Sequence, residues 1–204
     1  MIKIQNVSKS FGEHILFNNL SLDINDGDFV VVSGGSGCGK TTLLNMIGGI
    51  EEISDGKIIV DGYNISERRN KMKYFRTKVG FLFQNFALIE NKTVKQNLEL
   101  VRKSDRNSIS IEQVLEKVGL ADKINSKVYT LSGGEQQRIA LARLMVKKCD
   151  IILADEPTGS LDKANAEKIV SLLRELNEKE HKTVIMVTHD ENLKKQGSRI
   201  IELQ

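Results

Sequence analysis

The feature that most constrains the fold is a glycine-rich turn between a short apolar run and a helix-forming segment. The apolar run is Phe29–Val32, and the turn reads Gly34-Gly35-Ser36-Gly37-Cys38-Gly39-Lys40-Thr41. This turn fits the pattern G-x-x-x-x-G-K-[ST] in the strand-then-helix context that the pattern requires. Glycines let successive main-chain N–H groups curve around a phosphate, and the N-terminus of the helix from about Lys40 to Ile47 favours negative charge. The alternative is a turn that only joins a strand to a helix.

Two side chains of this loop have predicted roles in binding Mg·ATP. The ammonium of Lys40 can reach the β- and γ-phosphates, and the hydroxyl of Thr41 can be a ligand of Mg²⁺. The whole loop Gly34–Thr42 is predicted to bind the nucleotide: Gly34, Gly35, Ser36, Gly37, Cys38, Gly39, Lys40, Thr41 and Thr42.

The strand pattern predicts an α/β fold with two kinds of sheet. Alternating apolar residues in the first 24 positions indicate antiparallel strands. The uncharged runs Phe29–Val32, Ile151–Ala154 and Thr183–Val187 are typical of strands buried on both faces. An amphipathic helix over Ala164–Lys179 separates the last two, so the order strand, helix, strand predicts a mostly parallel core sheet with helices on its faces.

The region from residue 85 to residue 148 has helical spacing, for example at Ile139, Ala142 and Val146. We therefore expect a single domain over 1–204. Residues 1–84 and 149–204 form its ATP-binding core with the antiparallel part, and about 85–148 form an inserted α-helical subdomain.

Polar residues follow two of the predicted buried strands. Asp155 and Glu156 end one strand, where unpaired buried charge is costly unless a cation is present. Asp155 can hold Mg²⁺, and Glu156 can act as general base toward the attacking water; a helix-capping Asp is the alternative. His189 follows the strand Thr183–Val187, at the edge where an open α/β sheet places its ligand, and is predicted to lie at the γ-phosphate. A structural or exposed histidine is the alternative.

A second glycine-rich helix start lies at Leu131-Ser132-Gly133-Gly134-Glu135-Gln136-Gln137-Arg138. Ser132 and Glu135 have the spacing of a capping box. A cap does not require Gly133 and Gly134, which weaken a first helical turn. Close approach of a phosphate to the main chain would explain the glycines, and both interpretations can hold together.

Composition narrows the function classes. Charged residues make up 28% of the chain and the net charge is +3 with both signs interspersed, which does not indicate a dedicated nucleic-acid binder. The apolar runs are too short to cross a bilayer, and the N-terminus lacks the layout of a secretion signal. Two cysteines form neither a metal set nor a disulfide framework, so a reducing cytoplasm is expected.

Over essentially its whole length the chain resembles ABC-type ATPases. Gly34–Thr42 matches the Walker A loop, Ile151–Glu156 the Walker B strand, and Leu131–Gln137 the ABC signature. The resemblance implies further roles: Gln84 senses Mg²⁺ and the attacking water, Asp162 belongs to the D-loop, His189 is the switch histidine, and Phe11 stacks on adenine. Glu135 stands where many members have glutamine.

The motif variants are similar to the macrolide-exporter and lipoprotein-release branch. The run Gly133–Arg138, the run Pro157–Asp162 and the short length carry this likeness. Residues 85–94 are similar to small bacteriocin- or peptide-export ATPases.

The resemblance implies an ATP-dependent homodimer in which two chains face each other head to tail. Ser132 and Gly134 of one copy then close on the γ-phosphate held by Lys40 of the other. We expect a Mg-dependent ATPase that drives an integral membrane permease from the cytoplasmic face, as an exporter of peptides, lipids or drugs. The alternatives are a soluble ABC-type ATPase acting on nucleic acid or ribosomes and a phosphotransferase. The basic stretch Arg68–Lys78 is the one feature that suggests an anionic partner.

Overall fold

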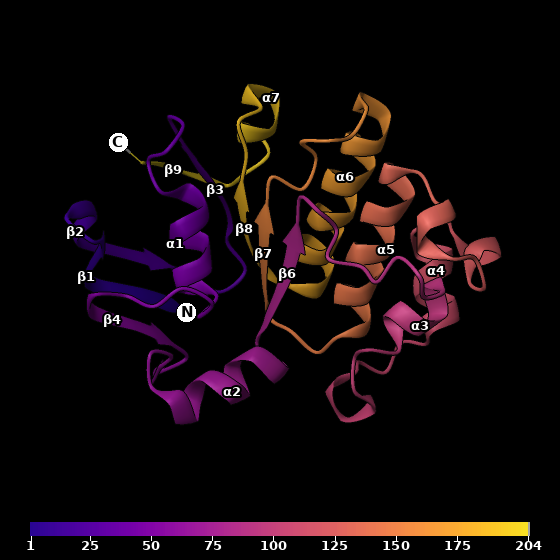
Figure 1. Cartoon of the computed structure of the whole chain (residues 1–204), viewed down its shortest axis with the longest axis horizontal. Helices are drawn as coiled ribbons and strands as arrows, with labels where there is room; N and C mark the ends of the chain where they lie inside the picture. Colours follow the sequence, from indigo (N-terminus) through magenta and orange to yellow (C-terminus); the bar gives the residue numbers. More distant parts are fainter. Residues whose placement is uncertain (204) are drawn as a thin grey trace.

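The computed structural model describes residues 1–203, with the side chains of residues 191 and 192 left aside, as two sheets and the helices around them (Figure 1). The strands are β1 (Ile2–Phe11), β2 (His14–Ile24), β3 (Phe29–Gly34), β4 (Asp55–Val60), β5 (Tyr63–Asn64), β6 (Val79–Phe83), β7 (Ile151–Asp155), β8 (Thr183–Val187) and β9 (Arg199–Leu203). The α-helices are α1 (Lys40–Ile47), α2 (Arg68–Thr77), α3 (Val94–Leu98), α4 (Ile111–Lys117), α5 (Gly133–Val146), α6 (Lys163–Glu180) and α7 (Glu191–Lys194). Short 3-10 turns lie at Lys103–Asp105, Ala121–Lys123 and Val128–Thr130.

The first sheet is antiparallel, in the order β2-β1-β4-β5. Ile2, Ile4 and Val7 of β1 are buried, as the alternating pattern predicts for a sheet with one face on the core. The hairpin between β1 and β2 turns at Gly12, whose φ of 59° lies in the left-handed region, and it pairs Phe11 with His14. The predicted antiparallel part is confirmed.

The core sheet has the order β6-β7-β8-β3-β9, and all of its strand pairs are parallel. Residues 29–32 of β3 are buried on both faces. Val187 of β8 pairs with Asp155 on one side and with Val32 on the other. Because these strands are in register, the chain after each of them emerges at one edge, which confirms the α/β fold and brings the predicted polar residues together.

Helices cover both faces of the core sheet. α1 lies between the two sheets, and α5 and α6 pack on the opposite face, with α3 and α4 outside them (Figure 1). One apolar cluster joins Leu98, Leu115 and Ile139 of the helical region to Ile152 and Met186 of the core sheet. The helical region is therefore supported by the sheet, and its division from the rest at residues 85 and 148 remains a prediction.

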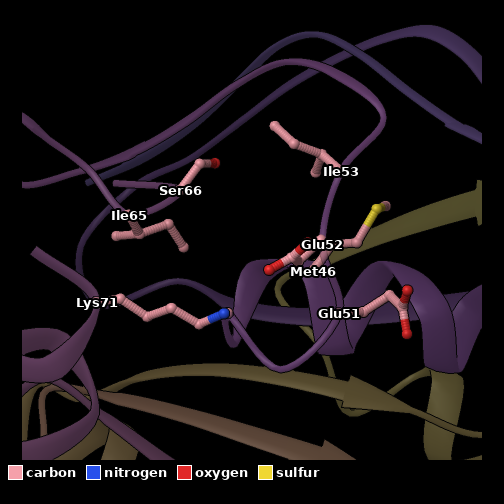
Figure 2. Close-up of a pocket in the computed structure, with 8 residues that line it drawn as sticks. Met46, Glu51, Glu52, Ile53, Ile65, Ser66 and Lys71 are labelled. Atoms are coloured by element: carbon pink, nitrogen blue, oxygen red, sulfur yellow. The ribbon is translucent and has the colours of Figure 1, made fainter. Parts of the chain in front are cut away.

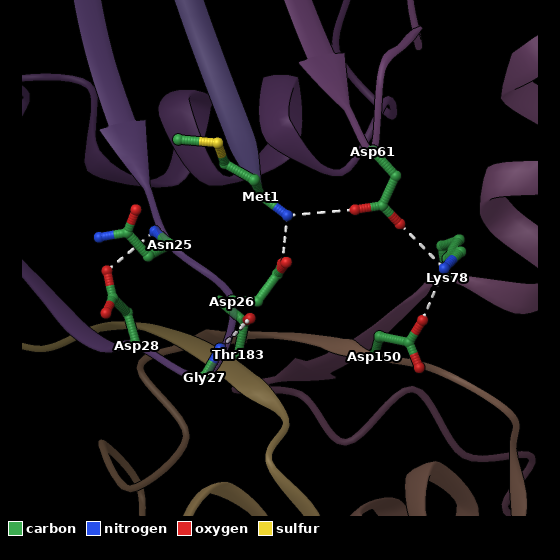
Figure 3. A network of polar contacts seen from close by, with 9 residues as sticks. All are labelled: Met1, Asn25, Asp26, Gly27, Asp28, Asp61, Lys78, Asp150 and Thr183. Carbon is green, nitrogen blue, oxygen red and sulfur yellow. Dashed lines mark hydrogen bonds and ion pairs between the residues drawn. The ribbon is translucent and has the colours of Figure 1, made fainter.

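The two sheets are also joined at the amino edge of the core sheet (Figure 3). The Met1 amine contacts Asp26 and lies 3.1 Å from Asp61. Lys78 lies 2.9 Å from Asp61 and 2.8 Å from Asp150, just before β7. The hydrogen bond from Lys78 lowers the pKa of Asp61. This network lies at the other end of the strands from residues 155, 156 and 189.

No helix in the described part of the chain is both long and apolar enough to cross a membrane.

Candidate functional site

The loop between β3 and α1 has a shape that only glycine permits at two positions. A Cβ on Gly34, which has φ 148°, would lie 2.4 Å from the carbonyl oxygen of Leu203. Gly39, the N-cap of α1, has φ 94°, and a Cβ there would lie 2.6 Å from the ring of Phe17. The start of α1 has no side-chain cap and no acidic residue in its first turn. Its first N–H groups and its dipole are therefore available to an anion.

Lys40 is held inside this loop. Its side chain is 6% exposed, and its ammonium donates to the carbonyl oxygens of Gly34 at 3.0 Å and Gly35 at 2.6 Å. An ammonium has three N–H donors, so a third can point to a phosphate oxygen. The positive charge is thus fixed where the main-chain donors also gather.

Thr41 and Asp155 supply oxygen atoms beside Lys40. The Thr41 hydroxyl donates to Oδ1 of Asp155 at 3.0 Å. Burial raises the pKa of Asp155 and the nearby charge of Glu156 adds to this, against the bond from Thr41 and the charge of Lys40. A hydroxyl and a carboxylate whose charge is only partly balanced are suitable ligands for Mg²⁺. This ion typically binds one or two protein groups and takes its remaining ligands from water and phosphate oxygens. Among the described residues, no group of three or more His, Cys, Asp or Glu side chains is arranged to hold a metal ion.

Glu156 and His189 form a pair at the ends of β7 and β8. Nε2 of His189 lies 2.7 Å from Oε1 of Glu156. Glu156 has φ 44°, a costly conformation for a residue with a side chain, and its N–H donates to the carbonyl of Val187. A Cβ on Gly159 would lie 3.2 Å from Nε2 of Gln84 and 3.5 Å from Oε2 of Glu156. The side-chain ends of Gln84 and Glu156 thus flank Gly159.

One cavity of about 440 Å³ is lined by Lys40, Thr41, Glu156 and His189 together, and not by Asp155 or Gln84. Its lining comprises Phe11, His14, Leu16, Ser36, Gly37, Gly39, Lys40, Thr41, Thr42, Glu156 and His189. The sequence patterns did not point to His14 or Leu16, which the β1–β2 hairpin brings to the loop. Phe11 is 49% exposed, and the Lys9 ammonium lies 4.4 Å from its ring centroid. Cys38 packs against the apolar cluster beneath α1 and does not line the cavity.

A second cavity, of about 210 Å³, lies at the other end of α1 (Figure 2). It is lined by Met46, Gly49, Glu51, Glu52, Ile53, Ile65, Ser66 and Lys71. None of the predicted site residues is among them. The predicted site residues that line a cavity are therefore gathered at the start of α1.

The Ser132–Gly134 turn and Asp162 do not line the nucleotide cavity of their own chain. The predicted capping box is present: the Ser132 hydroxyl accepts from the Glu135 N–H, and Glu135 accepts from the Ser132 N–H. A Cβ on Gly134 would lie 2.5 Å from Cγ of Asn165, whereas on Gly133 the nearest atom would be 3.6 Å away. Packing within the chain therefore explains Gly134, and Gly133 remains open to a ligand.

Asn165 links this turn to Asp162. Its amide nitrogen lies 2.6 Å from Oδ2 of Asp162, and its oxygen accepts from Arg138 at 2.5 Å. The main-chain N–H of Asn165 also bonds to Asp162, which lowers the pKa of that carboxyl.

Gln137 ends the signature run Leu131–Gln137, but the motif patterns assigned it no role of its own. It is fully buried, and its Nε2 donates to the carbonyl of Pro157 at 2.6 Å and to that of Phe83 at 3.3 Å. Helical spacing places it on one face with Leu141 and Leu144, at i+4 and i+7, so periodicity had the information to place it inward.

A model of the ABC transporter family matches residues 17–159. The chain belongs to the ABC transporter family. It is 38% identical over its full length to the macrolide export ATP-binding/permease protein MacB of Campylobacter jejuni, which it covers to 33%. It is 41% identical to the ABC transporter ATP-binding protein MJ1508 of Methanocaldococcus jannaschii, over 100% of this chain and 96% of the relative.

A solved structure agrees with this family assignment. The dimeric structure of MJ0796, an ABC transporter cassette from the same archaeon, matches with a TM-score of 0.87 at 40% identity, over 100% of this chain and 94% of that chain. A structure of MJ0796 in a post-hydrolysis state, bound to ADP and Pi, matches with a TM-score of 0.86 at 38% identity, with the same coverage. The predicted family and fold are confirmed, and the similarity to MacB agrees with the predicted macrolide-exporter branch. The chain spans about a third of the length of the MacB relatives, so activity and partners are argued separately below.

Proposed function

We propose that this ABC family chain is a Mg-dependent ATPase subunit that drives a membrane transporter. The observation that carries the proposal is one cavity lined by the phosphate loop, Lys40, Thr41 and the Glu156–His189 pair. Asp155 lies just behind it, bonded to the Thr41 hydroxyl. A donor-rich loop, a carboxylate for a cation and a second carboxylate for a water are the parts that phosphoryl transfer to water needs.

In the proposed mechanism the main-chain N–H groups of the loop and Lys40 hold the β- and γ-phosphates. Mg²⁺, held by Thr41 and Asp155 with assistance from Gln84, would neutralise charge on the phosphate oxygens. Oε2 of Glu156 accepts the proton of the attacking water, while His189 holds Oε1 and keeps the carboxylate oriented. Phe11 provides an exposed ring beside the loop on which adenine can stack.

We propose that a second copy completes the site. Ser132, Gly133, Gly134 and Asp162 are held as a unit by Asn165, yet they face no phosphate in their own chain. In a head-to-tail homodimer they would meet the γ-phosphate bound by the other copy. The dimeric structures of MJ0796, one of them with ADP and Pi, support this arrangement here.

The membrane partner is proposed from relatives. MacB combines ATP-binding and permease parts, as its name states, while this chain matches a third of its length. We propose that this chain works with an integral permease at the cytoplasmic face of the membrane, with peptides, lipids or drugs as exported substrates.

The nucleic-acid alternative rested on the basic stretch Arg68–Lys78. Arg76 makes two hydrogen bonds to Asp105, Lys78 pairs with Asp61 and Asp150, and Arg69 pairs with Glu67. Three of its six cations are thus neutralised within the fold. This pairing favours the transporter function.

Glu156→Gln tests the proposal. The amide cannot accept the water proton, so hydrolysis should fall about 10²- to 10⁴-fold, while ATP binding persists and a dimer accumulates in ATP on a sizing column. Glu175→Gln, at an exposed carboxylate paired with Lys179, is the control and should hydrolyse normally. A Glu156→Gln chain that stays monomeric in saturating ATP would contradict the two-copy site.

A further inference from the structure

Gln137 is a buried amide placed between two catalytic segments. Its Nε2 donates to the carbonyl oxygens of Phe83 and Pro157, which are the residues next to Gln84 and Glu156. One carboxamide therefore fixes the main chain beside both of the side chains that the proposed function assigns to water and Mg²⁺.

The orientation of this amide follows from its partners. Both groups that Nε2 contacts are carbonyls, so exchanging the nitrogen with the oxygen would leave oxygens facing oxygens. In the present orientation Oε1 is buried without a hydrogen-bond partner, and it is the one side-chain nitrogen or oxygen with this property in the part of the chain that the structure describes. An unpaired buried acceptor lowers the stability of the fold. The presence of glutamine at this position is therefore better explained by its two donated hydrogen bonds than by packing.

Gln137 also belongs to the helix that starts at the Ser132–Gly134 turn. It lies in the second turn of α5 and on the same buried face as Gly134. A shift of α5 along its axis would therefore move the Gln137 amide against the segments of Gln84 and Glu156. Through this contact the phosphate-facing turn of one nucleotide site is connected to the hydrolytic groups of the other.

We propose that Gln137 is a positioning residue for hydrolysis: it holds Gln84 and Glu156 in place through Phe83 and Pro157, and couples them to the Ser132–Gly134 turn. This role rests on the two-copy ATPase proposed above. It is a role in turnover and not in nucleotide affinity, because Gln137 does not line the nucleotide cavity.

Gln137→Met is the direct test, since methionine has a similar length and no donor. We expect kcat for ATP to fall about 10- to 100-fold, as displacements of about 1 Å at a catalytic group do, with KM within about twofold of the wild type. In a Glu156→Gln background the same substitution should leave ATP-induced dimerisation intact, because Lys40 and the Ser132–Gly134 turn remain.

The matched control is Asn107→Leu. The Asn107 amide also donates to two main-chain carbonyls, those of Met145 and Lys147, at the far end of α5. Its kcat should stay within about twofold of the wild type. Normal turnover in Gln137→Met, or an equal loss in Asn107→Leu, would overturn the proposal. The two-copy ATPase itself is tested separately, by hydrolysis and ATP-induced dimerisation of the wild type and of Glu156→Gln.

Gln137→Glu is an independent test, which remains valid even if the Gln137→Met variant does not fold. The two carbonyls repel a carboxylate, and burial raises the pKa of such a carboxyl. Its protonated form regains one donor, so kcat relative to the wild type should rise as the pH falls. A ratio that is independent of pH, or that falls with decreasing pH, would overturn the role of Gln137.

Discussion

Two helices of this chain start at glycines, and they use their main-chain groups differently: α1 follows the N-cap Gly39 of the phosphate loop, and α5 begins with Gly133 and Gly134. α1 has no side-chain cap and no acidic residue in its first turn. α5 has a complete capping box, and Glu135 lies in its first turn. A helix end that leaves its N–H groups unused is suited to bind an anion, whereas a self-capped end is stable without one.

The difference is consistent with a site divided between two copies. The loop at α1 has a lysine, a cavity and two carboxylates around it in the same chain. The turn at α5 caps its own helix and does not line the cavity that holds Lys40. The loop would thus determine nucleotide affinity, and the turn would determine whether two chains close.

Lys40→Ala should have the largest effect. It removes the one ammonium fixed by the loop carbonyls, and charge-assisted bonds to phosphate are strong. We expect ATP affinity to fall by at least about 100-fold, since each such bond is worth about 1.5–3 kcal/mol, measured by titration with a fluorescent ATP analogue. Lys182→Ala is the control, because Lys182 is equally buried and donates to the carbonyl of Cys149. Equal losses in both variants would mean that Lys40 acts through stability alone.

Gly134→Ala and Gly133→Ala separate packing from ligand approach at the turn. In Gly134→Ala the new methyl group would clash with Asn165. We expect the free energy of unfolding to fall by about 1–2 kcal/mol, after allowing for the better helix propensity of alanine. This corresponds to a decrease of about 2–8 °C in Tm. Gly133→Ala should keep the Tm and weaken ATP-induced dimerisation in a Glu156→Gln background. Thermal unfolding and sizing columns measure the two effects. A lower Tm in Gly133→Ala would remove the distinction.

The sequence patterns predict the phosphate loop and the residues at the ends of β7 and β8 because motif spacing and strand order determine them locally. They do not predict β6 or β9. Both are edge strands of the core sheet: β6 is uncharged but contains Gly80 and is only partly buried, and β9 is mostly exposed and includes Arg199 and Glu202. The contacts of Gln137 and Asn165 depend on how α5 meets β6 and α6. Such contacts follow from packing, and a polar residue in a helix is ordinarily read as exposed.

Asp155→Asn should stabilise the fold at neutral pH. Burial raises the folded-state pKa of Asp155 above its ordinary value, so the ionised carboxylate destabilises the fold at pH 7. This cost is absent once the carboxyl is protonated in acid. We expect a higher Tm than that of the wild type at pH 7, a gain that disappears as the pH falls through the raised pKa, with loss of Mg²⁺-dependent hydrolysis.

Asp162→Asn should change the Tm in the opposite direction, at the other half of the site. The Asn165 N–H lowers the pKa of Asp162, so its ionised form stabilises the fold at neutral pH, and that contribution is lost in acid as the carboxyl is protonated. Its Tm should therefore fall at pH 7. Thermal unfolding of both variants between pH 4 and 7 tests the pair, and like signs would contradict the contrast between the two halves.

Glu135→Gln should have the smallest effect, and it addresses the capped helix directly. Glutamine accepts the same hydrogen bond from the Ser132 N–H, so the cap persists, with a loss of less than about 1 kcal/mol from the helix dipole. The variant removes one negative charge from the turn that would approach a γ-phosphate. In a Glu156→Gln background the ATP-bound dimer should therefore be about two- to fivefold tighter at low salt, and the gain should shrink at high salt.

Glu112→Gln is the control for this last variant, because Glu112 is the first-turn acid of α4, whose cap is made by Ser110 and Gln113. Its dimer should be unchanged at every salt concentration. A weaker dimer in Glu135→Gln would mean that the carboxylate acts as a cap that the amide cannot replace. In that case closure would depend on the rigidity of the α5 start, and the charge of the turn would be secondary.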